Sequence, residues 1–284
     1  MSRQYVMVVR CVDRPGIVHH VTGAILGVGG NIIENAQFTD PDSNTFVMRT
    51  RIITDIEDAD QVRKGLLAAV GAAGCDIELQ VRAEDYLPRA LVMVSRFDHC
   101  LLDLLYRHRN GELSAQIPLV VSNHPDCAAV VEADGIPYLH LPVTAATKAE
   151  QEARLLALID EHHIDFVVLA RYMQVLSDPT CQALRGRAIN IHHSFLPGFK
   201  GAKPYHQAHA RGVKLIGATA HYVTPDLDEG PIIEQDVVRV SHTHDADTMV
   251  RLGRDVERSV LSRAVQAHAE SRVVLIGDRT VVFP

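Results

Sequence analysis

Phe166-Val167-Val168-Leu169-Ala170 indicates the fold class of this 284-residue chain, because every position in the stretch is apolar. A strand with one face in water alternates apolar and polar residues, whereas a strand buried on both faces is apolar throughout. Strands of the second kind form parallel sheets that are covered by helices on both sides. Comparable apolar runs occur at residues 90–94, 118–122, 137–141 and 188–191.

Stretches with helical spacing separate these predicted strands, and residues 148–162 are a clear example, with Leu155 and Leu158 on one face. Repeated strand–helix–strand units predict a Rossmann-like, open and mostly parallel sheet, whose site lies at the carboxyl ends of its strands. The turn after the first of these strands, Ser95 to Cys100, contains no glycine. Its bulky side chains would keep the backbone away from a phosphate, so we predict that the chain uses no NAD, FAD or ATP.

The first 84 residues predict a different order of strands and helices. An apolar strand at residues 5–11 ends at the turn Asp13-Arg14-Pro15-Gly16, and a helix follows. Two strands, a second helix and a last strand complete a βαββαβ order, which is a ferredoxin-like arrangement. We therefore predict two α/β domains, residues 1–84 and 90–284, joined by a polar linker at residues 85–89.

The composition is that of an ordinary globular protein, with 47% hydrophobic and 22% charged residues. A net charge of −7 gives no reason to expect nucleic acid or an anionic membrane as a partner. The five cysteines form no Cys-x-x-Cys pair, which indicates thiols in a reducing compartment rather than a disulfide or zinc framework. With no leader signature and no apolar run of membrane length, we expect a cytoplasmic protein.

Three side chains near the predicted strand ends have complementary chemistry. Asn190 can hold a developing oxyanion without titrating, and His192 can donate or accept a proton near neutrality. The two share a face of a strand because they are two residues apart. Asp228, 36 residues beyond His192, would favour the charged imidazole if the fold brought it near. Spacing alone leaves open that the histidine is structural.

The first domain resembles an ACT domain, a module that senses small ligands and often amino acids. The resemblance rests on residues 13–17 (DRPGI) and on Gly30-Asn31-Ile32 at the start of the next strand. It implies an effector site that uses Asp13, Gly16 and Asn31, with glycine or methionine as candidate ligands. It also implies paired ACT domains and a homotetramer. The alternative is that these are turn residues in a domain that serves mainly as a dimerisation surface.

Residues 90–240 resemble the formyltransferase family that uses 10-formyltetrahydrofolate. The order and spacing of NIHHSFLP at 190–197, KGAKPYHQA at 200–208, GATAHYV at 217–223 and LDEGPII at 227–233 carry the resemblance. It implies that Asn190 and His192 bind the formyl oxygen and that Asp228 supports proton transfer. The pterin ring would contact further residues, namely Met173, Val175, Leu176, Val223 and Asp226.

Two departures from that family bear on the reaction. The turn at residues 95–100 lacks the glycines with which some members hold a substrate phosphate, and His193 stands where many transferases have proline. With an ACT domain in front, the chain most resembles the formyltetrahydrofolate deformylases, which pass the formyl group to water. The expected products are formate, supplied to purine synthesis, and tetrahydrofolate. The folate is then the substrate, and no cofactor is expected.

Three other functions are compatible with parts of the sequence. A metal hydrolase would use some of the clustered histidines, but we expect no metal, because no known ligand spacing appears among His192, His193, His206, His209 and His221. A formyltransferase acting on an amine would use the same three catalytic side chains. A non-catalytic folate or amino-acid sensor would have no need of them.

Overall fold

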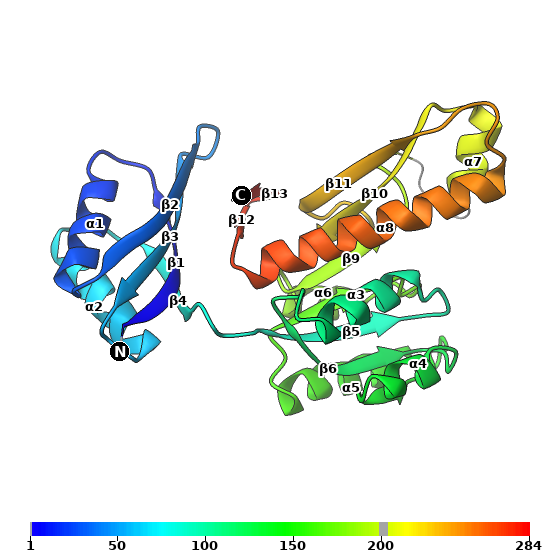
Figure 1. The fold of residues 1–284 in the computed structure, drawn as a ribbon, viewed down its shortest axis with the longest axis horizontal. Helices are drawn as coiled ribbons and strands as arrows, with labels where there is room; N and C mark the ends of the chain where they lie inside the picture. The colour runs from blue at the N-terminus through cyan, green and yellow to red at the C-terminus, as the bar shows by residue number, and fades with distance from the viewer. Residues whose placement is uncertain (1, 199–203) are drawn as a thin grey trace. The chain divides into compact units, whose positions relative to one another are not determined.

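The computed structural model describes residues 2–198 and 204–284, and the chain divides into two compact units (Figure 1). The first unit contains Met1–Tyr86, Ser271–Gly277 and Val281–Pro284, and the second contains Leu87–Glu270 and Asp278–Thr280. Across the described residues, no helix combines the length and apolar character that crossing a membrane requires.

The first unit is built on a four-stranded antiparallel sheet with the order β2-β3-β1-β4. Its elements are β1 (Arg3–Val12), α1 (Ile17–Gly27), β2 (Asn31–Asp40), β3 (Thr45–Thr54), α2 (Ala59–Ala72) and β4 (Glu78–Ala83). Placing β3 between the two parallel strands of a split βαβ unit is the ferredoxin-like topology. The βαββαβ order predicted from the sequence is confirmed.

The two faces of this sheet are covered differently. Both helices pack on one face, where Ile25 of α1 and Leu66 of α2 meet Met7 of β1. Two short strands near the C-terminus, β12 (Val273–Ile276) and β13 (Arg279–Val282), belong to the segment that covers the other face. Ile276 and Phe283 of that segment pack against Val47 of β3. The chain's last residues therefore add apolar burial to the first unit, although the sequence pattern grouped them with the second domain.

The second unit contains a seven-stranded sheet with the order β11-β10-β9-β8-β5-β6-β7. Its elements are β5 (Arg89–Val94), α3 (His99–Arg109), β6 (Gln116–Ser122), α4 (Ala128–Ala133), β7 (Tyr138–His140), α5 (Lys148–Glu161), β8 (Phe166–Leu169), α6 (Asp178–Ala183), β9 (Ala188–His192), α7 (Pro204–Arg211), β10 (Leu215–Tyr222), β11 (Ile232–Arg239) and α8 (Ala246–Ala269). Neighbouring strands from β9 to β7 pair in parallel, whereas β10 pairs antiparallel with both β9 and β11. The predicted open, mostly parallel sheet is confirmed.

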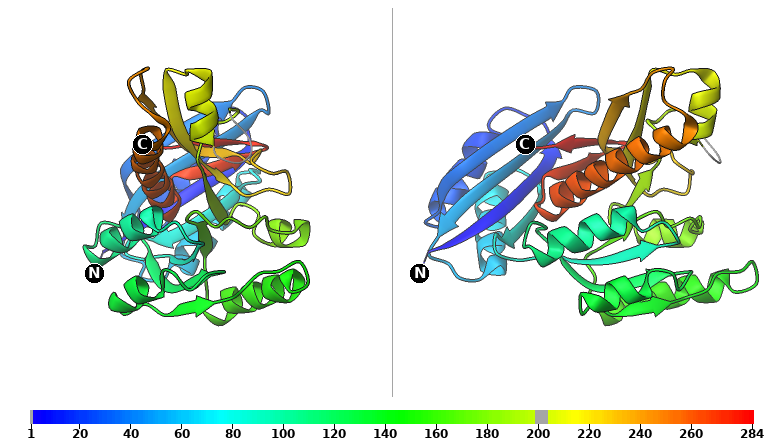
Figure 2. Two further views of the ribbon diagram at one scale, coloured as in Figure 1. Left: turned by 90° about the vertical axis from the view of Figure 1, so that its right-hand side faces the viewer. Right: turned by 45° about the vertical axis from the view of Figure 1, so that its right-hand side comes forward.

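Helices cover this sheet because its strands are apolar on both faces. Leu91, Leu119 and Val167 point to the face on which α5 and α6 pack. The long helix α8 packs against β9, β10 and β11 and against α3 (Figure 2). Its first turn is capped by Asp245, whose carboxylate accepts a hydrogen bond from Thr248 N at 2.7 Å.

The chain order reverses on either side of β5, because β6 and β8 are its two neighbours. A crevice at the carboxyl ends of the strands forms at such a reversal. Ser95, directly after β5, ties the strand ends together there. Its Oγ donates to Asn123 Oδ1 at 2.7 Å and accepts from Met173 N at 2.9 Å.

The connection from β10 to β11 makes a close turn that needs glycine at position 230. A Cβ on Gly230 would lie 1.7 Å from the carbonyl oxygen of Tyr222, far inside van der Waals contact. Within the same turn, Asp228 has a φ of 58°, in the left-handed region that few residues other than glycine, asparagine and aspartate adopt. Asp228 is therefore placed by a backbone path that only a narrow set of residues permits.

We predict that Gly230→Ala lowers the free energy of unfolding by about 1–3 kcal/mol, because the added methyl forces the turn away from Tyr222. Urea denaturation measures the loss. The matched control is Gly71→Ala in helix α2, where a Cβ meets nothing within 4 Å and should stabilise by roughly 0.5–1 kcal/mol. A Gly230→Ala protein as stable as the parent would contradict this account of the turn.

Candidate active site

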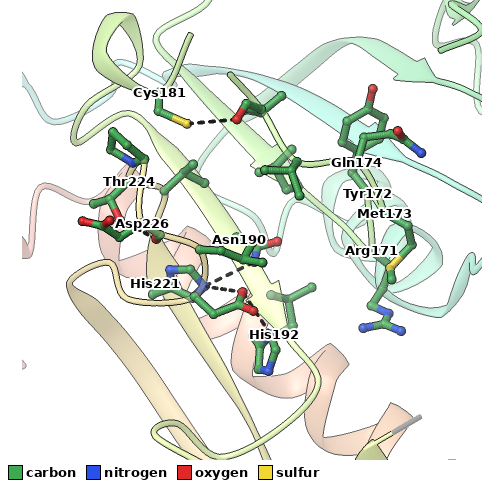
Figure 3. Close-up of a pocket in the computed structure, with 18 of the residues that line it drawn as sticks. Arg171, Tyr172, Met173, Gln174, Cys181, Asn190, His192, His221, Thr224 and Asp226 are labelled. Carbon is green, nitrogen blue, oxygen red and sulfur yellow. Dashed lines mark hydrogen bonds and ion pairs between the residues drawn. The ribbon is translucent and has the colours of Figure 1, made fainter. Parts of the chain in front are cut away.

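A pocket of about 240 Å³ opens in the second unit at the carboxyl ends of β8 and β9 (Figure 3). Three segments and Cys181 of α6 line it. The segments lie within residues 169–176 at the end of β8, 190–193 at the end of β9, and 221–228 at the end of β10. This is the edge of the sheet at which the sequence placed the site.

The structure brings Asn190, His192 and Asp228 together in this pocket. His192 Nδ1 lies 3.1 Å from Asp228 Oδ1, and both side chains are largely shielded from solvent. The other ring nitrogen of His192, Nε2, is buried and has no hydrogen-bond partner among the residues described. Buried polar atoms without partners are uncommon in folded proteins, so this nitrogen is suited to meet a bound molecule.

His221 is a fourth member of the group, although the sequence left its role open. It stands directly opposite Asn190 in the antiparallel pairing of β9 with β10. Its Nδ1 donates to the carbonyl oxygen of Tyr222 at 2.9 Å, so in the neutral ring Nε2 is the acceptor. Asn190 Nδ2 donates to that Nε2 at 3.2 Å, which fixes the orientation of the carboxamide. The sequence held one signal for this role. Thr219 and His221 are two residues apart on β10 and therefore share a face of the strand, and they pair with His192 and Asn190 respectively.

The surroundings fix the charge of two of these groups near neutral pH. The hydrogen bond from His192 lowers the pKa of the Asp228 carboxyl, with smaller contributions from the charge of nearby histidines, so this group is a carboxylate. Burial lowers the pKa of His221, which therefore remains a neutral imidazole. The catalytic group thus consists of the Asp228 carboxylate, the oriented carboxamide of Asn190 and the His192 imidazole.

His193, the next residue after His192, also lines the pocket. Its ring stacks on that of His192 with the centroids 4.9 Å apart. Burial and the neighbouring Arg171 guanidinium lower the pKa of His193 to about 4. Arg171 contacts His193 Nδ1 directly and has a positive φ of 64°.

The five residues expected to contact a pterin all line this pocket, namely Met173, Val175, Leu176, Val223 and Asp226. Met173 and Val175 expose about half of their surface (51% and 54%), as does Leu227 at 61%. Exposed apolar side chains around a concave site are suited to cover a flat ring. Lys200 to Lys203, part of the motif that supported the family resemblance, lie outside the described residues.

The three candidate effector residues do not gather within one chain. Asp13 and Gly16 lie in the turn that leads into α1, where Gly16 has a φ of 94°. Asn31 begins β2, beyond the other end of this 11-residue helix, which is about 16 Å long. A site that used all three would need a second copy of the domain.

The five clustered histidines do not form a group of converging ligand atoms. Of the residues described, only His99, Cys100 and Glu257 place potential metal-ligating atoms within 4.8 Å of one another. None of these three belongs to the histidine cluster seen in the sequence.

Known protein families match both units of the chain. A family model described as "Formyl transferase" matches residues 88–265, and one described as "ACT domain" matches residues 5–71. A formyltetrahydrofolate deformylase of Synechocystis sp. is 48% identical over 279 residues, which cover 98% of this chain and 97% of that protein.

Solved structures give the same assignment. The crystal structure of formyltetrahydrofolate deformylase from Burkholderia mallei aligns with a TM-score of 0.94 at 48% identity, over 99% of this chain and 100% of that one. A glycinamide ribonucleotide transformylase from Symbiobacterium toebii aligns with a TM-score of 0.67 at 30% identity, over 71% of this chain and 97% of that one. The family resemblance noted in the sequence is confirmed: the chain belongs to the formyl transferase family and, within it, to the formyltetrahydrofolate deformylases.

Proposed function

We propose that the chain hydrolyses 10-formyltetrahydrofolate to formate and tetrahydrofolate, with Asn190, His192 and Asp228 as the catalytic residues. The observation that carries the proposal is the convergence of these three side chains, with a 3.1 Å contact between His192 and Asp228, on a pocket with exposed apolar walls. Near-full-length relatives that bear the deformylase name support the choice of substrate.

The reaction begins when the oxygen of a water molecule attacks the formyl carbon on N10. The water proton passes to Asp228, either directly or through His192, and the carbonyl electrons move onto oxygen. Asn190 Nδ2, whose first hydrogen is donated to His221, offers its second hydrogen to this oxyanion together with protonated His192. Breaking of the C–N10 bond then releases formic acid, which loses its proton to solvent and leaves as formate. N10 takes the proton that Asp228 received, which gives tetrahydrofolate.

Transfer of the formyl group to an amine would use the same three side chains, and the transformylase at 30% identity makes it the nearest alternative. A direct assay separates the two reactions. The purified chain is incubated with 10-formyltetrahydrofolate and no amine, and formate and tetrahydrofolate are quantified. Equal, catalytic amounts of both products support hydrolysis, whereas turnover that requires an added amine contradicts it.

The Met173, Val175 and Leu176 wall and the segment around Val223 and Asp226 are the proposed pterin contacts. We further propose that the reaction takes place in the cytoplasm and supplies formate for purine synthesis. The five free cysteines, four of them buried, fit a reducing compartment. No cofactor takes part in the proposed reaction.

We also propose that the ACT domain binds a small amino acid, glycine or methionine, between paired domains of a homotetramer. The separation of Asn31 from Asp13 and Gly16 within one chain supports a site shared by two copies. The carboxylate of Asp13 would then pair with the amino group of the ligand.

We predict that Asp228→Asn reduces kcat by about 10²- to 10⁴-fold, because the amide cannot accept the proton. Asparagine tolerates a positive φ, so the thermal midpoint should change little. Asp160→Asn on the exposed surface of α5 is the control and should retain activity. A folded Asp228→Asn protein with near-normal formate release would remove Asp228 from the mechanism.

The pH dependence of kcat/KM follows from the two shifted groups. The pKa of Asp228 is lowered below its ordinary value near 4, so the carboxylate persists as pH falls towards that value. The pKa of His221 is lowered by burial, so its ring stays neutral to a lower pH than an ordinary histidine does. If water passes its proton directly to Asp228, we predict that kcat/KM does not fall between pH 7 and about pH 5.5. A one-proton loss of activity centred near pH 6.5 would contradict direct transfer and would indicate a neutral histidine as the immediate base.

For the effector, isothermal titration calorimetry of the full chain should detect glycine or methionine binding. Asp13→Asn should weaken that binding by about tenfold or more, because a charged hydrogen bond is lost. Formate release without effector should be unaffected. If neither amino acid binds, or if both proteins bind equally well, this effector site is wrong.

A further inference from the structure

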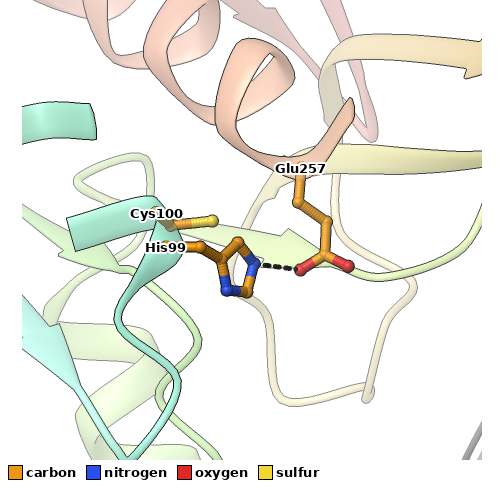
Figure 4. Close-up of side chains that lie close together, drawn as sticks. All are labelled: His99, Cys100 and Glu257. Carbon is orange, nitrogen blue, oxygen red and sulfur yellow. Dashed lines mark hydrogen bonds and ion pairs between the residues drawn. The ribbon is translucent and has the colours of Figure 1, made fainter. Parts of the chain in front are cut away.

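A second set of buried polar side chains lies beside the pocket, outside the three catalytic residues. Its centre is Glu257 of α8, whose side chain is 1% exposed. Glu257 Oε2 accepts from His99 Nε2 of α3 at 2.8 Å (Figure 4). Its Oε1 accepts from Tyr205 OH of α7 at 2.7 Å. Arg171 Nε lies 3.3 Å from the same carboxylate.

This carboxylate is charged despite its depth. Burial works against the charged form, but the His99 hydrogen bond, the Arg171 charge and the Tyr205 hydrogen bond together lower the pKa of Glu257. His99, Cys100 and Glu257 are also the group whose potential metal ligands lie within 4.8 Å of one another. A metal cation there would stand beside the Arg171 guanidinium, which already neutralises Glu257, so we interpret Glu257 as the partner of Arg171.

Arg171 is held from three directions. Its Nε faces Glu257, its Nη1 donates to His193 Nδ1, and its guanidinium carbon lies 5.6 Å from the centre of the Phe97 ring. The planar guanidinium can make these contacts at once, which the single ammonium group of lysine could not. The side chain is only 10% exposed, so its direction is fixed by this packing.

The contact with Arg171 determines where His193 carries its proton. A guanidinium only donates hydrogen bonds, so His193 Nδ1 must be the acceptor and Nε2 must carry the hydrogen. The stacked His192 ring has the opposite environment, because its Nδ1 faces the Asp228 carboxylate. Two imidazolium rings 4.9 Å apart would repel each other, so only one of the pair is readily charged.

We propose that Arg171, anchored by Glu257, keeps His193 neutral and thereby assigns the single positive charge of the stacked pair to His192. Arg171 and Glu257 are then positioning residues for the His192–Asp228 pair. The lowered pKa of His193 is consistent with this assignment. The catalytic role of this charge assignment rests on the proposed hydrolysis. The charge assignment itself can be measured without an activity assay.

Within the described residues, other titratable groups surround this pair and its Arg171–Glu257 anchor. Asp228 after β10 contacts His192, Tyr205 on α7 packs against His193, and His221 on β10 lies near Asp228. His99 and Cys100 on α3 adjoin Glu257 on α8 rather than the two rings. Among these described groups, Asp228 and Glu257 are the anionic ones. Both carboxylates favour a proton on His193, but burial, the Arg171 guanidinium and His192 oppose it more strongly, so the net effect lowers the pKa of His193. Asp228 contacts His192 directly, and Glu257 is engaged by Arg171.

The first test is nuclear magnetic resonance of the full chain with ¹⁵N-labelled histidine, in which His193→Asn identifies the His193 signals. We expect a neutral His193 with its proton on Nε2 from pH 8 down to about pH 5.5. A charged His193 at pH 6, or a neutral ring with its proton on Nδ1, would overturn the proposal. This outcome does not depend on whether the chain hydrolyses folate.

The second test removes the anchor while avoiding a lone buried charge. Arg171→Met with Glu257→Gln eliminates both charges of the pair. His193 should then titrate at a higher pH, because the Arg171 charge opposes its protonation more strongly than Glu257 favours it. The ratio kcat/KM should fall by about twofold or more, because protons now divide between the two rings. Arg154→Met with Glu161→Gln, an exposed pair on α5, is the matched control and should change neither quantity.

Adding His193→Asn to the Arg171→Met, Glu257→Gln protein distinguishes charge assignment from a merely structural role. Asparagine cannot take a proton, so the lost kcat/KM should largely return. An unchanged His193 titration in the double variant, or a loss of kcat/KM that His193→Asn leaves in place, would contradict the proposal. If the double variant does not fold, the titration of the unmodified chain still decides it.

Discussion

The 3.1 Å contact between His192 and the Asp228 carboxylate is the interaction on which the site depends. It joins the end of strand β9 to a turn 36 residues further along the chain. Asp228 reaches the histidine because its backbone is left-handed and because Gly230 lets the turn pass against Tyr222. The Tyr222 carbonyl also orients His221, which in turn holds Asn190. One turn therefore sets the geometry of all these groups.

A second network reaches the stacked histidines from the opposite direction, through Arg171 and Glu257. The two networks place opposite charges against the two rings: a carboxylate contacts His192, and a guanidinium contacts His193. The interaction energy of such charges is small in water and larger in the buried site. The long helix α8 has a direct part in this chemistry, since it supplies Glu257 to the network and His268 to the hydroxyl of Tyr222.

The sequence was sufficient to predict the βαββαβ order of the first unit and the parallel strands of the second, because apolar runs such as residues 166–170 leave few alternatives to a buried parallel sheet. It did not predict helix α7 or strand β11. Asn190 and His192 could be placed at a strand end by the same reasoning. Glu257 could not, because an acidic residue on a long helix looks like a solvated surface position until tertiary packing buries it. The packing of Ile276 and Phe283 on the first unit was equally invisible, since two short strands carry no signal for their partner.

The central claim is that water, rather than an amine, receives the formyl group. The most direct measurement is turnover of 10-formyltetrahydrofolate in ¹⁸O-labelled water, followed by mass spectrometry of the formate. Attack by water on the formyl carbon predicts that each formate carries one solvent oxygen, formed together with tetrahydrofolate. Formate without solvent oxygen, or no formate until an amine is supplied, would contradict the account.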